Sequence, residues 1–150
     1  MKFILAFLLS IGSLKAATTG TLALTGIIPK KVEITVSPTP AASNLNLELT
    51  QSNLSVATLT GKSNVNAGYK ITVISSNLGK LVHTVNNTQF VNYTLKLDTT
   101  SLPLTSPSFV NYTGKGTYSK DVNISYTGVD GFNFDDGNYT DTLTFTISAN

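Results

Sequence analysis

Hydrophobic and polar residues alternate over the last part of the chain. Between Tyr139 and Ala149 the odd positions carry Tyr, Asp, Leu, Phe, Ile and Ala, and the even positions carry Thr or Ser. Successive side chains on a strand point to opposite faces, so Leu143, Phe145 and Ile147 share one face that a core must cover. The pattern predicts one long, half-buried final strand over residues 139–149.

The same alternation recurs along most of the chain. A turn-rich link is predicted over residues 61–68, and the turn at 76–80 predicts a hairpin between the strands on either side of it. No stretch beyond the first residues has helical periodicity, so the many short strands predict an all-β protein, either a sandwich or a barrel. The other predicted strands cover residues 32–36, 45–49, 54–59, 69–75, 81–85, 90–97, 109–113 and 120–126.

The first residues predict a secretory signal peptide. Lys2 precedes an apolar run that is too short to span a bilayer, and small residues follow around Ala16. Cleavage after Ala16 divides the chain into a signal peptide at 1–16, an alternating N-terminal segment at 17–28 and one domain at 29–150. The sequence therefore predicts an exported protein that does not insert into a membrane once the signal is removed.

Charge and composition narrow the classes of function. Ten lysines stand against eight acidic residues, and loss of Lys2 and Lys15 with the signal peptide makes the two signs equal. Net charge therefore gives no reason to expect binding to nucleic acid or acidic lipid. Charged residues make up 12% of the chain, and Thr, Ser and Asn take their place, which suits a sheet exposed outside the cell. Cysteine is absent, so packing rather than disulfides must hold the fold.

Candidate chemistry is sparse. His83 is the single histidine and no cysteine exists, so the chain has too few ligands for a typical zinc site and too few residues for a His-assisted nucleophile. We interpret His83 as a structural strand residue. No two carboxylates stand out as a glycosidase pair. Asp130, Asp135 and Asp136 lie close enough in sequence to suggest a calcium site, yet Asp and Gly are also common in ordinary turns. We expect no catalysis and no cofactor, and we keep these three residues only as candidate metal ligands.

Residues 17–28 allow two interpretations. They are either an ordinary first strand that pairs within its own sheet or a detachable strand offered to a neighbour. An exposed sheet edge presents unpaired amide and carbonyl groups that can template another chain. Leu22, Leu24, Gly26 and Ile28 share one face of the segment, and Gly26 suits either a close approach of two backbones or a plain bend.

Several segments together carry a family resemblance. They are the alternating residues 21–28, Ser63-Asn64 with 68–73 and 75–77, residues 91–95, and the ending Gly137-Asn138-Tyr139-Thr140-Asp141-Thr142-Leu143-Thr144-Phe145-Thr146-Ile147. Through them the chain resembles the pilin subunits of chaperone-usher fimbriae, in the branch that includes spore coat protein U-like domains. The resemblance covers most of the chain that follows the signal peptide.

The resemblance implies an immunoglobulin-like antiparallel sandwich that is incomplete because its seventh strand is missing. In this family a periplasmic chaperone lends a strand to the gap, and the N-terminal segment of the next subunit replaces it, with an outer-membrane usher as a further partner. Carried over to this chain, Leu22, Leu24, Gly26 and Ile28 are the expected donor residues. The expected acceptor groove is lined by Leu143, Phe145 and Ile147 of the final strand.

Two functions of different classes follow from these observations. The first is a structural subunit of a bacterial surface fibre, secreted through the periplasm to the cell surface and joined to identical or related subunits by donor-strand complementation. The second is a self-complete secreted β-sandwich, a binding module or adhesin, whose N-terminal strand closes its own sheet. The place of residues 21–28 in the fold separates the two.

Overall fold

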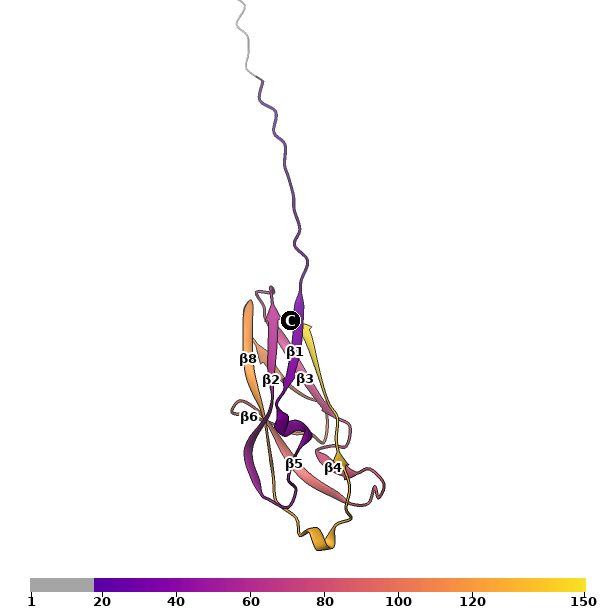
Figure 1. Ribbon diagram of the computed structural model, residues 1–150. Coiled ribbons are helices and arrows are strands. Elements are labelled where there is room, and N and C mark those ends of the chain that lie inside the picture. Colours follow the sequence, from indigo (N-terminus) through magenta and orange to yellow (C-terminus); the bar gives the residue numbers. More distant parts are fainter. Residues whose placement is uncertain (1–17) are drawn as a thin grey trace, which may run out of the picture.

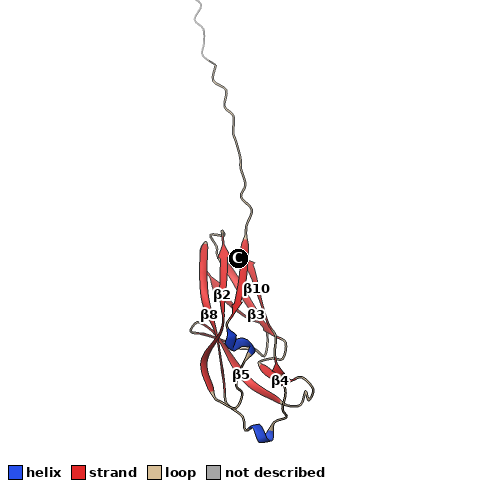
Figure 2. Cartoon of the chain, in the orientation of Figure 1, coloured by secondary structure: helices blue, strands red, loops and turns tan. Residues whose placement is uncertain are grey.

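The computed structural model describes residues 18–150, and the signal peptide predicted at 1–16 lies outside the described residues. Strands make up the body of the described chain, with two short 3-10 helices, η1 (Pro40–Ser43) and η2 (Gly131–Asn133) (Figure 2). Within residues 18–150, no helix has the length and apolar character needed to cross a membrane. The strands are β1 (Val32–Pro38), β2 (Gln51–Ser63), β3 (Tyr69–Ser75), β4 (Lys80–His83), β5 (Phe90–Leu97), β6 (Thr100–Leu102), β7 (Ser108–Tyr112), β8 (Gly116–Tyr126), β9 (Tyr139–Thr140) and β10 (Leu143–Ala149).

These strands form two antiparallel sheets. One has seven strands in the order β1-β2-β8-β5-β4-β9, with β6 pairing to β5, and the other has three in the order β10-β3-β7. The body is elongated, and the N-terminal residues leave one of its ends as a single extended chain (Figure 1). That end also holds the C-terminus of β10.

The core lies between the two sheets because each strand turns alternate residues inward. On β3, Tyr69, Ile71 and Val73 are buried, while Lys70 and Thr72 between them are only partly covered. The buried residues of β2, β5 and β8 belong to the same apolar cluster. The predicted all-β, antiparallel sandwich is therefore confirmed.

Strands with strict alternation have the predicted bounds, as β3 and β5 show. β2 is longer than the predicted 54–59 and continues through Gly61, which the sequence placed in a turn. A side chain there has no room, because a Cβ on Gly61 would lie 2.9 Å from the Tyr69 hydroxyl oxygen. Gly61 thus marks a close approach between the sheets and not a turn.

The strand predicted over residues 45–49 is wrong. The chain forms η1 and then a turn, in which Asn46 accepts hydrogen bonds from two amides, at its carbonyl from Leu49 (3.3 Å) and at its side chain from Glu48 (3.1 Å). Asn side chains favour such local bonds over a strand ladder. Leu45 and Leu47 still pack against the core, whereas Leu49 is 56% exposed.

The hairpin predicted around residues 76–80 is also wrong. β3 pairs with β10 and β7, whereas β4 pairs with β5 and β9, so the chain crosses from one sheet to the other here. The local turn is as tight as predicted, since Leu78 and Gly79 have φ of 55° and 80° and the Gly79 amide donates to Ser75 Oγ at 2.7 Å. The turn residues determine that the chain reverses here, but they do not determine which strand pairs with β3.

The single final strand predicted over residues 139–149 is in fact two strands. β9 pairs with β4 and β10 pairs with β3, so the chain changes sheets at Asp141. The Asp141 carboxylate accepts hydrogen bonds from the hydroxyls of Ser75 and Tyr93, both at 2.5 Å, and from the Asn77 amide at 2.9 Å. These bonds hold the break in place.

A second carboxylate gives the fold a dependence on pH. Asp98 has φ of 51° and accepts from the Lys120 ammonium and the Asp121 amide. The hydrogen bond from Lys120 is the largest effect and lowers the pKa of Asp98. Burial opposes it, and the bond from the Asp121 amide adds a smaller lowering. A lowered pKa stabilises the folded state above the pKa of the unfolded chain, and this stabilisation is lost as the pH falls through the folded-state value.

We expect Asp98→Asn to lower the urea midpoint at pH 7. The free energy of unfolding should fall by less than about 1 kcal/mol, because solvent screens this partly exposed pair. The difference from the unmodified protein should shrink from about pH 4 downward, where both chains carry a neutral side chain. Urea titrations at several pH values measure it. A difference that stays constant down to pH 2 contradicts the assigned role of the carboxylate.

Candidate functional site

Two sheet edges next to each other lack a strand partner. Within residues 18–150, β1 pairs only with β2, and β10 pairs only with β3. β1 and β10 nevertheless run side by side, with Cα atoms that approach within 8 Å (Figure 1). No ladder joins them in this part of the chain, so each leaves one edge unsatisfied by strand pairing.

Hydrogen bonds at the ends of β10 fix which backbone groups face the unpaired edge. Thr142 accepts from the Ser76 amide at 3.0 Å, and the Asn150 amide donates to Gly68 at 3.1 Å. In an antiparallel pair alternate residues carry these bonds, so the even residues of β10 bond β3. The amides and carbonyls of the odd residues point the other way, toward the open edge. These odd residues are Leu143, Phe145 and Ile147.

β1 has the matching arrangement. The Thr39 amide donates to Val56 at 2.8 Å and the Asn64 amide to Lys31 at 3.1 Å, so the odd residues of β1 bond β2. The even residues turn their backbone groups toward β10. These even residues are Val32, Ile34, Val36 and Pro38, and Pro38 has no amide to donate.

The six residues Val32, Ile34, Val36, Leu143, Phe145 and Ile147 define what we call the β1–β10 seam. Five of them pack against the core and stay only half-buried, and Val36 is 40% exposed. A strand between β1 and β10 requires about 9.6 Å, two strand spacings, which is more than the present approach. Seating one therefore requires β1 to move outward by a few ångström.

A cavity of about 680 Å³ lies near one end of the seam. It lies between residues 42–48, which follow β1, and residues 129–141, which precede β10. Leu45, Leu47 and Phe134 give it apolar walls, and each of them also packs against the core. An extended chain that enters the seam from this end contacts these apolar walls before it reaches β10.

The predicted donor residues do not fill this seam. Leu22, Leu24 and Ile28 are 83%, 87% and 86% exposed, and nothing lies within 4 Å of a Cβ built on Gly26. Residues 18–31 form no strand pair and project along the long axis of the molecule (Figure 1). The structure does not bring the predicted donor and acceptor residues together within one chain.

The root of this extension is held firmly. Asn64 donates from Nδ2 to the Pro29 carbonyl at 2.9 Å and accepts at Oδ1 from the Lys31 amide at 2.7 Å. Lys30 Nζ donates to the Asn150 oxygen at 2.9 Å. These bonds direct the extension away from the body. Sequence reasoning missed the role of Asn64, because an Asn in a turn-rich link gives no sign that it bridges a distant segment.

No protein-family model and no curated protein matches the chain. Among solved structures, the chain is similar to the CssB subunit complemented with a donor strand from the CssA subunit of the enterotoxigenic Escherichia coli colonization factor CS6. The TM-score is 0.45 and the sequence identity is 16%, over 77% of this chain and 82% of that chain.

The candidate metal ligands serve as loop residues. Asp130 accepts from the Phe132 amide and from Asn133 Nδ2, and Asp135 accepts from Asn86 Nδ2 at 2.7 Å. Among residues 18–150, no three His, Cys, Asp or Glu side chains are grouped so that they could hold a metal ion. Asp136 presents its backbone carbonyl, not its carboxylate, to the ring of His83.

His83 ties two loops together. It is 6% exposed, and its Nδ1 accepts from the amides of Val85 (3.3 Å) and Asn86 (2.7 Å). A nitrogen that accepts carries no proton, so Nε2 is the protonated one and donates to the Asp136 carbonyl at 3.0 Å. A Cβ on Gly137 would lie 2.5 Å from this Nε2, so the loop approaches the ring closely.

Proposed function

We propose that this protein is a structural subunit of a bacterial surface fibre, in which residues 17–28 of one copy fill the β1–β10 seam of the next. The observation that carries the proposal is that one chain has both an uncovered apolar segment and a sheet edge without a strand partner. The extension exposes apolar side chains at alternate positions, and the seam exposes backbone groups and half-covered apolar side chains. Each supplies what the other lacks.

The dimensions and energies agree with this arrangement. At about 3.3 Å per residue, residues 18–28 span about 36 Å, enough to run the length of β10 and reach the cavity beyond it. Full burial of an exposed Leu or Ile contributes about 1.5–3 kcal/mol. A chain seated in the seam also gains ladder hydrogen bonds on both sides, which strand addition uses for affinity.

Partners and location follow from the same proposal. Identical or related subunits are the direct partners, and a periplasmic chaperone that covers the seam before assembly fits the exposed, partly apolar edge. Secretion through the periplasm to the cell surface requires the signal predicted at 1–16. The subunit has a mechanical role and no catalytic one.

A peptide experiment tests the proposal. A chain without residues 17–28 should remain monomeric, and adding a peptide of residues 18–31 should raise its urea midpoint. At a peptide concentration of 100 times Kd the expected stabilisation is about 2.7 kcal/mol. A peptide with Leu22→Asp and Leu24→Asp is the control and should produce no shift. If both peptides leave the midpoint unchanged, the seam does not accept this segment.

One observation favours a second function. The extension leaves the body at the end of its own seam, where Lys30 contacts Asn150, so a reversal at Pro29 places residues 18–28 beside β1 of the same chain. The protein is then a self-complete secreted module or adhesin. Size-exclusion chromatography and limited proteolysis distinguish the two functions: a stable monomer with residues 18–28 protected indicates the module, and polymers indicate the fibre.

A further inference from the structure

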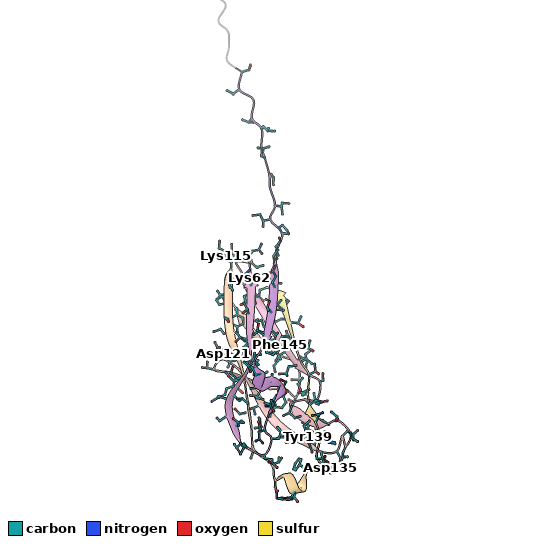
Figure 3. The ribbon with its side chains drawn as sticks, viewed as in Figure 1. Lys62, Lys115, Asp121, Asp135, Tyr139 and Phe145 are labelled. Carbon is teal, nitrogen blue, oxygen red and sulfur yellow. The ribbon has the colours of Figure 1, made fainter. Side chains whose placement is uncertain are left out.

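The two ends of the molecule carry opposite charge. At the end from which the extension leaves, a cavity of about 580 Å³ is lined by Lys31, Lys62 and Lys115, with Glu33 as its acidic residue. Lys30 stands beside them in the chain. We call these four lysines the basic pole. Figure 3 shows Lys62 and Lys115 together at this end of the body.

The cavity at the opposite end is acidic. Its lining includes Glu48, Asp135, Asp136 and Asp141 and no lysine. Asp141 is engaged by the hydrogen bonds described above, but the other three are exposed. We call Glu48, Asp135 and Asp136 the acidic pole. Figure 3 shows Asp135 at the end of the body farthest from Lys62 and Lys115. Lysines and acidic residues are equal in number within residues 18–150, so charge is separated along the molecule without a net excess.

In the fibre proposed above, the short linker brings the basic pole of one copy against an end of the next copy. Ile28 is the last donor residue and β1 begins at Val32, so only residues 29–31 join donor segment and body. Three residues span at most about 10 Å. The Asn64 bonds to Pro29 and Lys31 remove slack from this linker. An extension seated in a neighbour therefore draws its own basic pole against whichever end of the neighbour it entered.

Charge selects that end. Entering beside the neighbour's own extension places two basic poles in contact, and entering through the cavity places lysines against carboxylates. Like charges brought close together repel, opposite charges attract, and both effects are strongest when little salt screens them. Several such pairs separate the two arrangements clearly at low salt.

The geometry points to an end-to-end docking face between copies of this chain, formed by the basic pole of one copy and the acidic pole of the next. This inference rests on the proposed fibre and adds the orientation of its subunits. A contact between two different ends repeats without closing and gives filaments, whereas contact between identical ends gives closed pairs. The charged ends thus make the strand exchange directional.

Full-length subunits with reversed poles test this face. One variant carries Lys62→Glu and Lys115→Glu, and the other carries Glu48→Lys and Asp136→Lys, so each has two ends of one sign. Each alone should form heat-resistant ladders at least 10-fold more slowly than the unmodified protein at 20 mM NaCl, because steering is lost. An equimolar mixture should recover most of the rate, and 500 mM NaCl should reduce all of these differences.

The control variant carries Lys80→Glu and Lys96→Glu, which change net charge by the same amount at positions on β4 and β5 that line neither cavity. Because neither residue lines a charged cavity, this variant should assemble within about 3-fold of the unmodified protein. Mixing it with the Glu48→Lys and Asp136→Lys variant should give no comparable recovery. Reversed-pole variants that assemble at the unmodified rate in low salt would overturn the docking face. So would equal recovery with the control variant. Ladders remain possible in those outcomes, so this failure is distinct from failure of the strand exchange, which abolishes ladders in every variant.

Discussion

Replacing Leu24 by Asp is expected to abolish fibre formation and to leave the secreted monomer as stable as the unmodified one. Leu24 is 87% exposed in the subunit, so the change costs the monomer nothing in packing. In the proposed junction, the same position faces the half-covered apolar side chains of a neighbour's seam, which include Phe145. An unpaired carboxylate in such a place costs about 3–5 kcal/mol per junction, which lowers the affinity of each junction by more than 100-fold.

Electron microscopy and heat-resistant ladders on gels measure this result, and thermal unfolding of the monomer checks its stability. Thr25→Asp is the matched control, because Thr25 adjoins Leu24 on the opposite face of the segment and should tolerate the same charge. Fibres of normal length from the Leu24→Asp protein would remove the donor strand from the mechanism. Loss of fibres in both variants would indicate a general effect of charge instead of side-chain burial.

Local periodicity was sufficient to predict much of the fold. β3 and β5 have strict alternation and are covered on one face by the core, so a pattern of period two is enough to find them and their inward residues. β1 follows the same rule through Val32, Ile34 and Val36. Because these strands obey one short-range rule, the all-β sandwich could be predicted without knowing how they pair.

Pairing is the part that the sequence did not reveal. Residues 45–49 alternate like a strand, but the side chain of Asn46 captures a nearby amide and leaves a turn. The hairpin expected around Gly79 does not form, because β3 and β4 pair with strands of different sheets. Within the turn, Ser75 and Asn77 bond the distant Asp141. These outcomes depend on residues that are distant in sequence, and no local pattern encodes them.

The candidate site divides in the same way. The alternation in residues 143–147 predicted which side chains share a face, and Leu143, Phe145 and Ile147 all pack against the core. The face expected on the N-terminal segment stays a prediction. That the extension stands clear of the body depends on Asn64, and that β1 supplies the other edge of the seam depends on strand order. The sequence therefore predicted the components of the proposed junction but only half of its receiving surface.

Asp141 determines how that receiving surface is placed, and Asp141→Ala is expected to lower the free energy of unfolding by about 3–5 kcal/mol. The change leaves the Tyr93 and Ser75 hydroxyls and the Asn77 amide without their shared acceptor, and bonds to a charged group contribute about 1.5–3 kcal/mol each. For a domain of this size the melting temperature should fall by about 10–15 °C. Asp121→Ala is the control, because the exposed Asp121 side chain makes no hydrogen bond to the described residues.

The milder Asp141→Asn change separates the role of the charge from that of the shape. Burial and the hydrogen bond to the Asp141 carboxylate both raise the pKa of Tyr93. A neutral amide removes the effect of the carboxylate, so the Tyr93 pKa should fall and its ring should begin to ionise at a lower pH. NMR of the Tyr93 ring during alkaline titration measures this separately from the other five tyrosines. Since Asp141 anchors the start of β10, Asp141→Asn should also slow ladder formation while the monomer remains folded. An unchanged Tyr93 titration together with an unchanged rate of ladder formation would show that the break between β9 and β10 does not depend on this carboxylate.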